Sequence, residues 1–98
     1  MNTIVPAAAV NAGHQVSYWR EEPHEVDMIV TGPGARFAVE IKSGGFSARD
    51  LQGLMAFVAR YRDFRPLVIG DDAHRATAER AGIDFIRWQE YLLDGFPC

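Results

Sequence analysis

The stretch from Glu25 to Gly44 constrains the fold more than any other part of the chain. Two apolar runs flank a Gly-Pro-Gly turn, as expected for the two strands of a hairpin. Asp27 lies inside the first run, and Glu40 and Lys42 alternate with apolar residues in the second. Because side chains alternate along a strand, Glu40 and Lys42 share one face. Charged groups inside apolar strands are rare unless they are paired or bind a metal, so these three residues need an explanation.

The length of 98 residues predicts a single domain with one modest core. The longest uncharged apolar stretch, residues 3–10, is too short to span a bilayer. It also lacks the basic region of a signal peptide, so we expect a cytoplasmic protein without a membrane segment. The single cysteine, Cys98, is the last residue and can form no internal disulfide.

The net charge of −3 argues against a dedicated nucleic-acid binder with a basic face. A metal ion in an acidic site can nevertheless supply positive charge locally. Lys42 is the only lysine, against nine arginines. Lysine is a compact charge that arginine does not replace, so its position in the hairpin favours a functional role over a chance occurrence.

Apolar periodicity and turn residues predict alternating strands and helices. In order, we expect a short helix over residues 7–12, strands over 15–20, 25–31 and 36–42, a helix over 47–63, a strand over 67–70, a helix from 71 or 72 to 81, a strand over 83–88 and a helical turn over 89–93. This order predicts an α/β fold with a central mixed sheet and a β-β-β-α-β-α-β core flanked by helices.

The helix after the hairpin is expected to begin with Ser47 and Asp50, which have the spacing of a capping box. Its buried face is predicted to consist of apolar residues at helical spacing: Leu51, Leu54, Met55, Val58 and Tyr61. Arg65 and the proline that follows it are expected to end the helical region.

The hairpin residues Asp27, Glu40 and Lys42 resemble the motif of the PD-(D/E)xK superfamily of restriction-endonuclease-like proteins, although no proline precedes the aspartate. The strings around them are similar to the C-terminal domain of unknown function of prokaryotic AAA-type ATPases, over about residues 16–93. These strings are residues 18–20, 25–30, 39–44, 50–54 and 88–92. The resemblance implies a restriction-endonuclease-like fold and a metal-dependent nuclease, an endo- or exodeoxyribonuclease that acts on DNA phosphodiesters.

The residues themselves would support that chemistry. Asp27 and Glu40, with the backbone carbonyl of Ile41, offer oxygen ligands to Mg²⁺ or Mn²⁺. Such a metal polarises a phosphodiester and lowers the pKa of a bound water. Lys42 would orient that water or offset negative charge on the phosphorane. Gln52, on the first turns of the following helix, is expected near the same cleft, and it completes the predicted catalytic set.

Two departures from the family pattern leave alternatives open. The chain has no Gly-rich Gly-Lys-Ser/Thr loop, so it cannot bind ATP in the way of the ATPase module found in related proteins. Residues 1–13 carry no acidic side chain, although active nucleases of the superfamily usually add one from a first helix. The chain is then either a fragment, with residues 1–14 as a truncated first helix, or a stand-alone remnant.

The second candidate function is therefore a non-catalytic module that binds nucleic acid or a partner protein. In that case Lys42 forms a partly buried ion pair with Asp27 or Glu40, an arrangement that adds little net stability. A truncated first helix would leave apolar sheet surface uncovered, which predicts a homodimer.

Other residues are weaker candidates for a functional site. Glu25 either extends the site next to Asp27 or belongs to a solvated turn. Three histidines lack zinc-ligand spacing and are predicted at the surface or in turns: His14, His24 and His74. Three arginines cluster at the end of the long helix, where cations suit a helix C-terminus or contact a nucleic-acid backbone: Arg60, Arg62 and Arg65.

Overall fold

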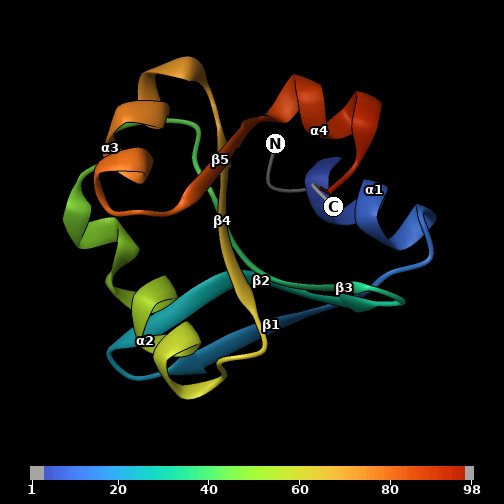
Figure 1. Ribbon diagram of the computed structural model, residues 1–98, viewed down its shortest axis with the longest axis horizontal. Coiled ribbons are helices and arrows are strands. Elements are labelled where there is room, and N and C mark those ends of the chain that lie inside the picture. The colour runs from blue at the N-terminus through green and yellow to red at the C-terminus, as the bar shows by residue number, and fades with distance from the viewer. Residues whose placement is uncertain (1–3, 97–98) are drawn as a thin grey trace.

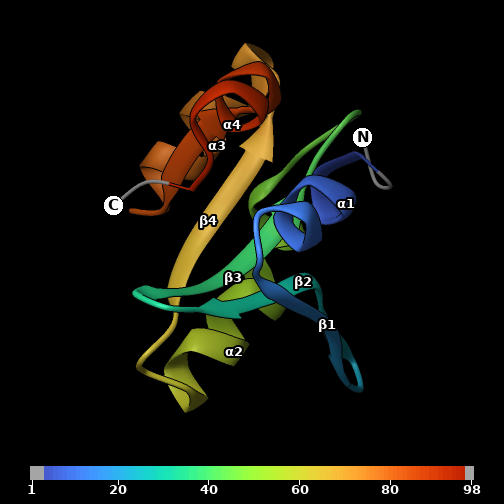
Figure 2. The ribbon, with the colours of Figure 1, turned by 90° about the vertical axis from the view of Figure 1, so that its right-hand side faces the viewer.

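The computed structural model describes residues 4–96 and places a five-stranded sheet between two layers of helices (Figure 1 and Figure 2). The strands are β1 (Gln15–Glu21), β2 (His24–Gly32), β3 (Ala35–Ile41), β4 (Arg65–Gly70) and β5 (Asp84–Arg87). The helices are α1 (Ile4–Asn11), α2 (Gln52–Arg60), α3 (Arg75–Arg80) and α4 (Trp88–Asp94), with short 3₁₀ turns η1 (Ala48–Leu51) and η2 (Asp72–His74). None of these helices is both long and apolar enough to cross a membrane.

The sheet is mixed, as the order of elements predicts. Its strand order is β1-β2-β3-β4-β5, with antiparallel pairing from β1 to β3 and parallel pairing from β3 to β5. The two parallel connections each contain a helix, α2 and α3, because a parallel crossover is too long for a tight turn. The central strand β3 therefore joins the antiparallel and parallel halves.

Apolar side chains cover both faces of the sheet, and this gives two cores. Beneath α2 and α3 the buried residues are Val26, Ile29, Ala38, Leu51, Leu54, Phe57, Val68, Ala78, Ile83 and Phe85. Beneath α1 and α4 they are Val5, Met28, Val30, Phe37, Val39, Ile41, Leu67, Ile69 and Tyr91. Residues 67–70 of β4 are all buried, which explains why this strand is a continuous apolar run.

The first helix begins earlier than the sequence suggests. Pro6 lies within the first turn of α1, where a missing backbone N–H costs no intrahelical hydrogen bond. Val5 and Ala9 are fully buried against the sheet. The expectation of an uncovered sheet face is therefore wrong, because α1 and α4 cover it, and the homodimer prediction loses that support.

The helical region after β3 differs from its prediction in two ways. It starts as the 3₁₀ turn η1, and the α-helix ends at Arg60 rather than near residue 63. Its buried residues are Leu51, Leu54 and Phe57, whereas Met55 is 44% exposed. Residues three apart lie on one face of an α-helix, so Phe57 faces the sheet with Leu54, whereas Met55 is turned about 100° away from Leu54.

The C-terminal third follows the predicted order, but several boundaries differ: β4 begins at Arg65 rather than at residue 67, and β5 covers residues 84–87 rather than 83–88. Asp71 precedes η2 in an extended conformation and occupies its N-cap, and Gly82 has a positive φ of 75° at the end of α3. Trp88, predicted in the last strand, is instead the first residue of α4. Its Nε1–H donates to Asp71 Oδ1 at 3.0 Å, which links α4 to the end of β4.

Candidate functional site

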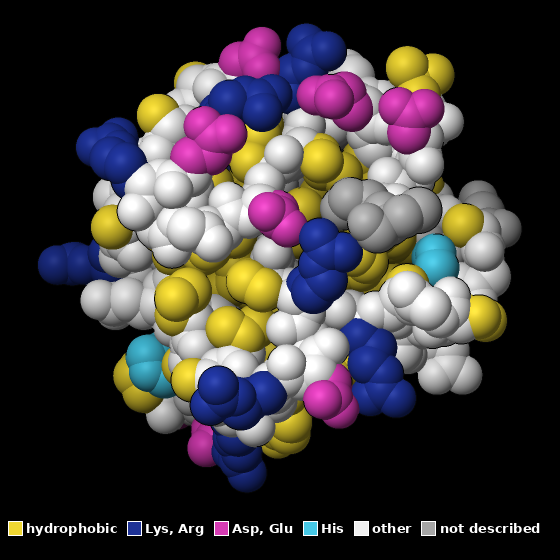
Figure 3. Space-filling model, viewed as in Figure 1, with side chains coloured by type: hydrophobic (Ala, Val, Ile, Leu, Met, Phe, Trp, Pro, Cys, Tyr) yellow, Lys and Arg dark blue, Asp and Glu magenta, His cyan; other side chains and the backbone are white. Residues whose placement is uncertain are grey.

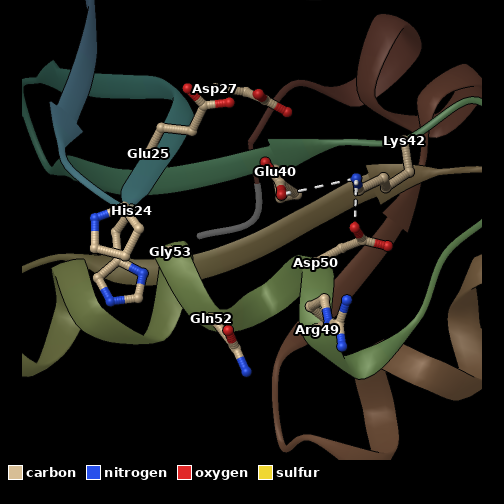
Figure 4. Close-up of a pocket in the computed structure, with 10 residues that line it drawn as sticks. His24, Glu25, Asp27, Glu40, Lys42, Arg49, Asp50, Gln52 and Gly53 are labelled. Atoms are coloured by element: carbon tan, nitrogen blue, oxygen red, sulfur yellow. Dashed lines mark ion pairs between the residues drawn. The ribbon is translucent and has the colours of Figure 1, made fainter.

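A pocket of about 390 Å³ opens beside the C-terminal end of β3 (Figure 4). Its lining residues come from the β1–β2 turn, β2, the end of β3 and the residue after it, η1 and the start of α2. They are Pro23, His24, Glu25, Asp27, Glu40, Lys42, Arg49, Asp50, Gln52 and Gly53. Four residues that the sequence singles out as catalytic, Asp27, Glu40, Lys42 and Gln52, thus meet in one pocket. The side chain of Ile41 lies in the opposite core, so only its backbone is available to the site.

A β-bulge positions Asp27. Two residues of β2, Asp27 and Met28, stand opposite the single residue Tyr18 of β1. The β2–β3 ladder ends at the pair Met28 and Val39, so the next backbone groups of β3 need other partners. The carboxylate of Asp27 supplies one, since its Oδ2 accepts a hydrogen bond from the backbone N–H of Ile41 at 3.0 Å. Asp27 is therefore both part of the sheet and part of the pocket wall.

Glu40 is the buried acid of the site. It is only 8% exposed, although it lies on β3 beside the carboxylate of Asp27. Burial, followed by the neighbouring Asp27 carboxylate, raises the pKa of Glu40 to about 9, and Lys42 offsets this only in part. At neutral pH and without a bound cation, Glu40 is therefore protonated. A bound cation would offset the repulsion between the two neighbouring carboxylates and so favour the charged form of both.

Lys42 faces two acids rather than one. Its Nζ lies 3.9 Å from Glu40 Oε2 and 3.8 Å from Asp50 Oδ1, both near the long limit for an ion pair. Of the two partners predicted for Lys42, Asp27 or Glu40, the structure has Glu40, and among the described residues Lys42 forms no ion pair with Asp27. Asp50 also caps η1, because the backbone N–H of Ser47 donates to its Oδ2 at 2.9 Å. The capping-box spacing thus predicted the position of Asp50, but not its second role beside Lys42.

The start of α2 forms the far wall of the pocket. Gln52 is exposed there, and Figure 4 shows its amide turned away from Glu40 and Lys42. Gly53 packs directly on the backbone of β2, since a Cβ at this position would lie 2.2 Å from the carbonyl oxygen of Glu25. The glycine inside an amphipathic helix was the available signal for this close approach.

Glu25 belongs to the pocket as well as to the β1–β2 ribbon. Its Oε2 accepts a hydrogen bond from the hydroxyl of Tyr18 at 2.6 Å, and its side chain lines the pocket. The sequence left open whether this residue extends the site or lies in a solvated turn, and the structure places it in β2 at the pocket wall.

His74 is the residue that sequence reasoning placed wrongly. It is 5% exposed rather than at the surface. Its Nδ1 accepts the backbone N–H of Asp71 at 3.0 Å, so its Nε2–H donates to the carbonyl of Gly44 at 2.6 Å. Gly70 leaves room for the ring, because a Cβ there would lie 2.7 Å from Nδ1. The loop that follows Lys42 is therefore tied to the end of β4.

The donor set suits a hard divalent cation. Asp27 and Glu40 bring carboxylate oxygens together, and Mg²⁺ is bound by few protein carboxylates because it keeps several waters. Within residues 4–96, no group of three or more His, Cys, Asp or Glu side chains is arranged to hold a metal by itself. Any metal here would therefore rely on two carboxylates, backbone oxygen such as that of Ile41, and water.

The chain is similar to a protein family of unknown function. A family model described as Domain of unknown function (DUF4143) matches residues 1–91, a region that contains every residue of the pocket. No curated protein and no solved structure matches the chain.

Proposed function

The chain belongs to the DUF4143 family, and we propose that its pocket binds Mg²⁺ or Mn²⁺ and hydrolyses phosphodiester bonds in DNA. The convergence of Asp27, Glu40 and Lys42 from two strands onto one pocket carries this proposal. Hard oxygen donors next to a single lysine are the residue types that metal-assisted phosphodiester hydrolysis requires.

Each residue has a separate task in this proposal. A bound divalent ion supplies Lewis acidity toward the phosphodiester. Asp27 and Glu40 hold the ion, and Glu40 gives up its proton when the ion binds, because opposite charge favours the carboxylate. Lys42 offsets negative charge that develops on the phosphate, and Asp50 keeps its ammonium group at the pocket wall.

The proposal includes membership of the PD-(D/E)xK superfamily with its restriction-endonuclease-like fold. Three antiparallel strands followed by parallel β4 and β5 are consistent with such a fold. The acids at the β2 bulge and on β3 are where the Asp and Glu-x-Lys parts of that motif would fall. Association with an AAA-type ATPase module is part of the same proposal and rests on the sequence resemblance.

The second candidate is a non-catalytic module that binds nucleic acid or a partner protein. The position of Lys42 favours it, because Asp50 lies 3.8 Å from the ammonium group and offsets its charge without any ligand. Under this alternative, divalent ions would not bind at the pocket.

Titration calorimetry with Mg²⁺ and Mn²⁺ separates the two candidates. We expect saturable binding by the wild type, loss of binding in Asp27→Asn and Glu40→Gln, and unchanged binding in Asp63→Asn. Asp63 is a suitable control because it is a highly exposed acid outside the pocket. A nuclease assay on single- and double-stranded DNA then tests Lys42→Met, which should bind the metal but not cleave. No binding by the wild type would exclude the metal-dependent proposal.

A further inference from the structure

The arginines of this chain fall into two groups. Six of the nine form ion pairs with carboxylates: Arg20, Arg36, Arg60, Arg65, Arg75 and Arg87. Within the described part of the chain, Arg49, Arg62 and Arg80 have no acidic partner of this kind. In a protein with a net charge of −3, such unneutralised cations are the groups available to an anionic ligand.

Two of these three arginines line neighbouring pockets. Arg49 lines the pocket of Asp27 and Glu40. Arg80 lines a second pocket of about 420 Å³, formed by Phe46, Ser47, Ala48, Thr77, Arg80 and Ala81. This second pocket lies between the loop that follows β3 and helix α3. The Nε–H of Arg80 donates to the carbonyl of Ala76 at 3.3 Å, which leaves the outer nitrogens of the guanidinium group free for other contacts.

The two pockets share one wall. Residues 46–48 line the second pocket, and the next two residues, Arg49 and Asp50, line the first. The ammonium group of Lys42, which belongs to the first pocket, lies 5.6 Å from the centroid of the Phe46 ring. A ligand that contacts Lys42 can therefore reach the ring of Phe46 with its next group.

We propose that the second pocket binds an unpaired base of single-stranded DNA, while Arg49 and Arg80 bind the phosphates on either side of it. This inference rests on the proposed function, since it assigns the form of the DNA substrate. Phe46 offers an aromatic ring for stacking, which accepts any base, and Thr77 offers a hydroxyl for a hydrogen bond. Arginine binds phosphate in a bidentate manner, so the two free guanidinium groups suit the backbone.

The charge distribution on one face of the molecule favours a single strand over a duplex at that face. On the face shown in Figure 3, Lys and Arg are interspersed with Asp and Glu and form no continuous basic surface. A duplex is bound chiefly through many phosphate contacts, which such a surface does not supply. A base can also enter a pocket only after it leaves the stack, and this costs least in a single strand.

Fluorescence anisotropy in metal-free buffer tests this inference without any need for cleavage. The probes are a short fluorescein-labelled oligothymidylate and the same oligomer with abasic sites in its centre. The variants are Phe46→Leu and Arg80→Gln, with Arg62→Gln as the matched control. Arg62 has no acidic partner among residues 4–96 either, but it lies in the α2–β4 connection, at the opposite end of β4 from α3 (Figure 1).

Stacking of a base on Phe46 predicts a specific pattern of affinities. We expect the abasic sites to weaken wild-type binding about fivefold or more, and Phe46→Leu to weaken binding of the intact oligomer by a similar factor. Phe46→Leu should leave affinity for the abasic oligomer unchanged, which a merely misfolded variant would not do. Arg80→Gln should weaken both probes and lower the salt slope by about one, whereas Arg62→Gln should stay within about twofold of the wild type.

Three results would overturn the inference. They are equal affinity of the wild type for the intact and abasic oligomers, an equal effect of Phe46→Leu on both, and tighter binding of a duplex or an oligouridylate than of the oligothymidylate. Because the buffer contains no metal, these results are independent of the calorimetric test. Metal binding without oligomer binding would leave the metal site standing and exclude the base pocket alone.

Discussion

The carboxylate of Asp27 lies 3.0 Å from the backbone nitrogen of Ile41 and takes the place of a strand carbonyl where the β2–β3 ladder ends. The bulge in β2 turns Asp27 to this position, and the hydrogen bond fixes it beside Glu40. One residue therefore serves both the sheet and the pocket, and its two tasks can be separated by substitution.

Asp27→Asn and Asp27→Ala should differ in stability but not in metal binding. Asparagine keeps an oxygen acceptor for the N–H of Ile41, whereas alanine leaves that donor without its partner. We expect Asp27→Ala to lower the free energy of unfolding by about 1 kcal/mol, with a smaller loss for Asp27→Asn, because a hydrogen bond contributes about that much. Urea denaturation measures this difference. Equal losses in the two variants would show that the hydrogen bond to Ile41 does not matter.

Glu40 makes stability depend on pH in a definite direction. Its pKa in the folded protein is raised to about 9, from an ordinary value of 4.5. Between these values the folded state holds a proton that the unfolded chain releases, so stability is greatest below about pH 4.5 and falls as pH rises toward 9. Glu40→Gln removes this dependence and should be more stable than the wild type at pH 8, by on the order of a few kcal/mol.

Thermal denaturation from pH 5 to pH 9 in metal-free buffer measures this effect. Glu79→Gln is the matched control, because Glu79 is an exposed glutamate on α3 outside the pocket. The control should keep the wild-type pH slope. A wild-type profile as flat as that of Glu40→Gln would show that Glu40 titrates normally.

Divalent ions should offset the loss of folding stability that the buried Glu40 causes at neutral and alkaline pH. A ligand that binds only the folded state at about 100 times its Kd stabilises it by about 2.7 kcal/mol. We expect Mg²⁺ to raise the Tm of the wild type and to leave Glu40→Gln unchanged. Protons compete with the ion for Glu40, so the stabilisation by Mg²⁺ should grow as pH rises toward 9. Addition of EDTA should return the wild type to its metal-free Tm.

Gly53 should tolerate no side chain, although it lies in a helix. A Cβ there would lie 2.2 Å from the carbonyl oxygen of Glu25, so α2 or β2 must shift to admit it. Alanine gains up to about 1 kcal/mol in helix propensity, but overpacking against backbone costs about 1–3 kcal/mol. We expect Gly53→Ala to lower stability and to weaken metal binding. Gly45→Ala is the control, because nothing lies within 4 Å of its added Cβ.

Much of the fold is predictable from local sequence, and the reason is periodicity. The apolar run at residues 67–70 indicated a strand buried on both faces, and β4 confirms it. The alternation around Glu40 and Lys42 placed both on one face, and both line one pocket. The alternation of apolar residues cannot by itself reveal a bulge, however. Whether one residue or two of β2 stand opposite Tyr18 depends on the register with β1.

The parts that sequence missed depend on contacts between distant segments. Phe57 is buried beside Leu54, which lies three residues before it on the same helix face, whereas Met55 lies at the edge of that face and is 44% exposed. Apolar spacing is compatible with burial of either Phe57 or Met55, and the packing of α2 on the sheet decides between them. His74 is buried through contacts with Gly44, which lies 30 residues away. A lone histidine near charged residues carries no periodic signal, so its position could be found only in three dimensions.

His74 should position the loop that carries the wall between the two pockets. Its imidazole bridges the N–H of Asp71 and the carbonyl of Gly44, and its ring packs edge-on against Phe46 at 5.6 Å. His74→Ala removes both hydrogen bonds and leaves a cavity, so we expect a loss of about 2–4 kcal/mol in the free energy of unfolding.

The more conservative substitution His74→Gln distinguishes a role of His74 in positioning the loop from a role in stability alone. His74→Gln can donate to Gly44 but cannot also reach Asp71 with the geometry of a ring, so it should recover part of the stability. If His74 positions the loop, both variants weaken Mg²⁺ binding and oligothymidylate binding under conditions where circular dichroism shows them fully folded. Ligand affinities equal to those of the wild type in the folded variants would limit His74 to a structural role.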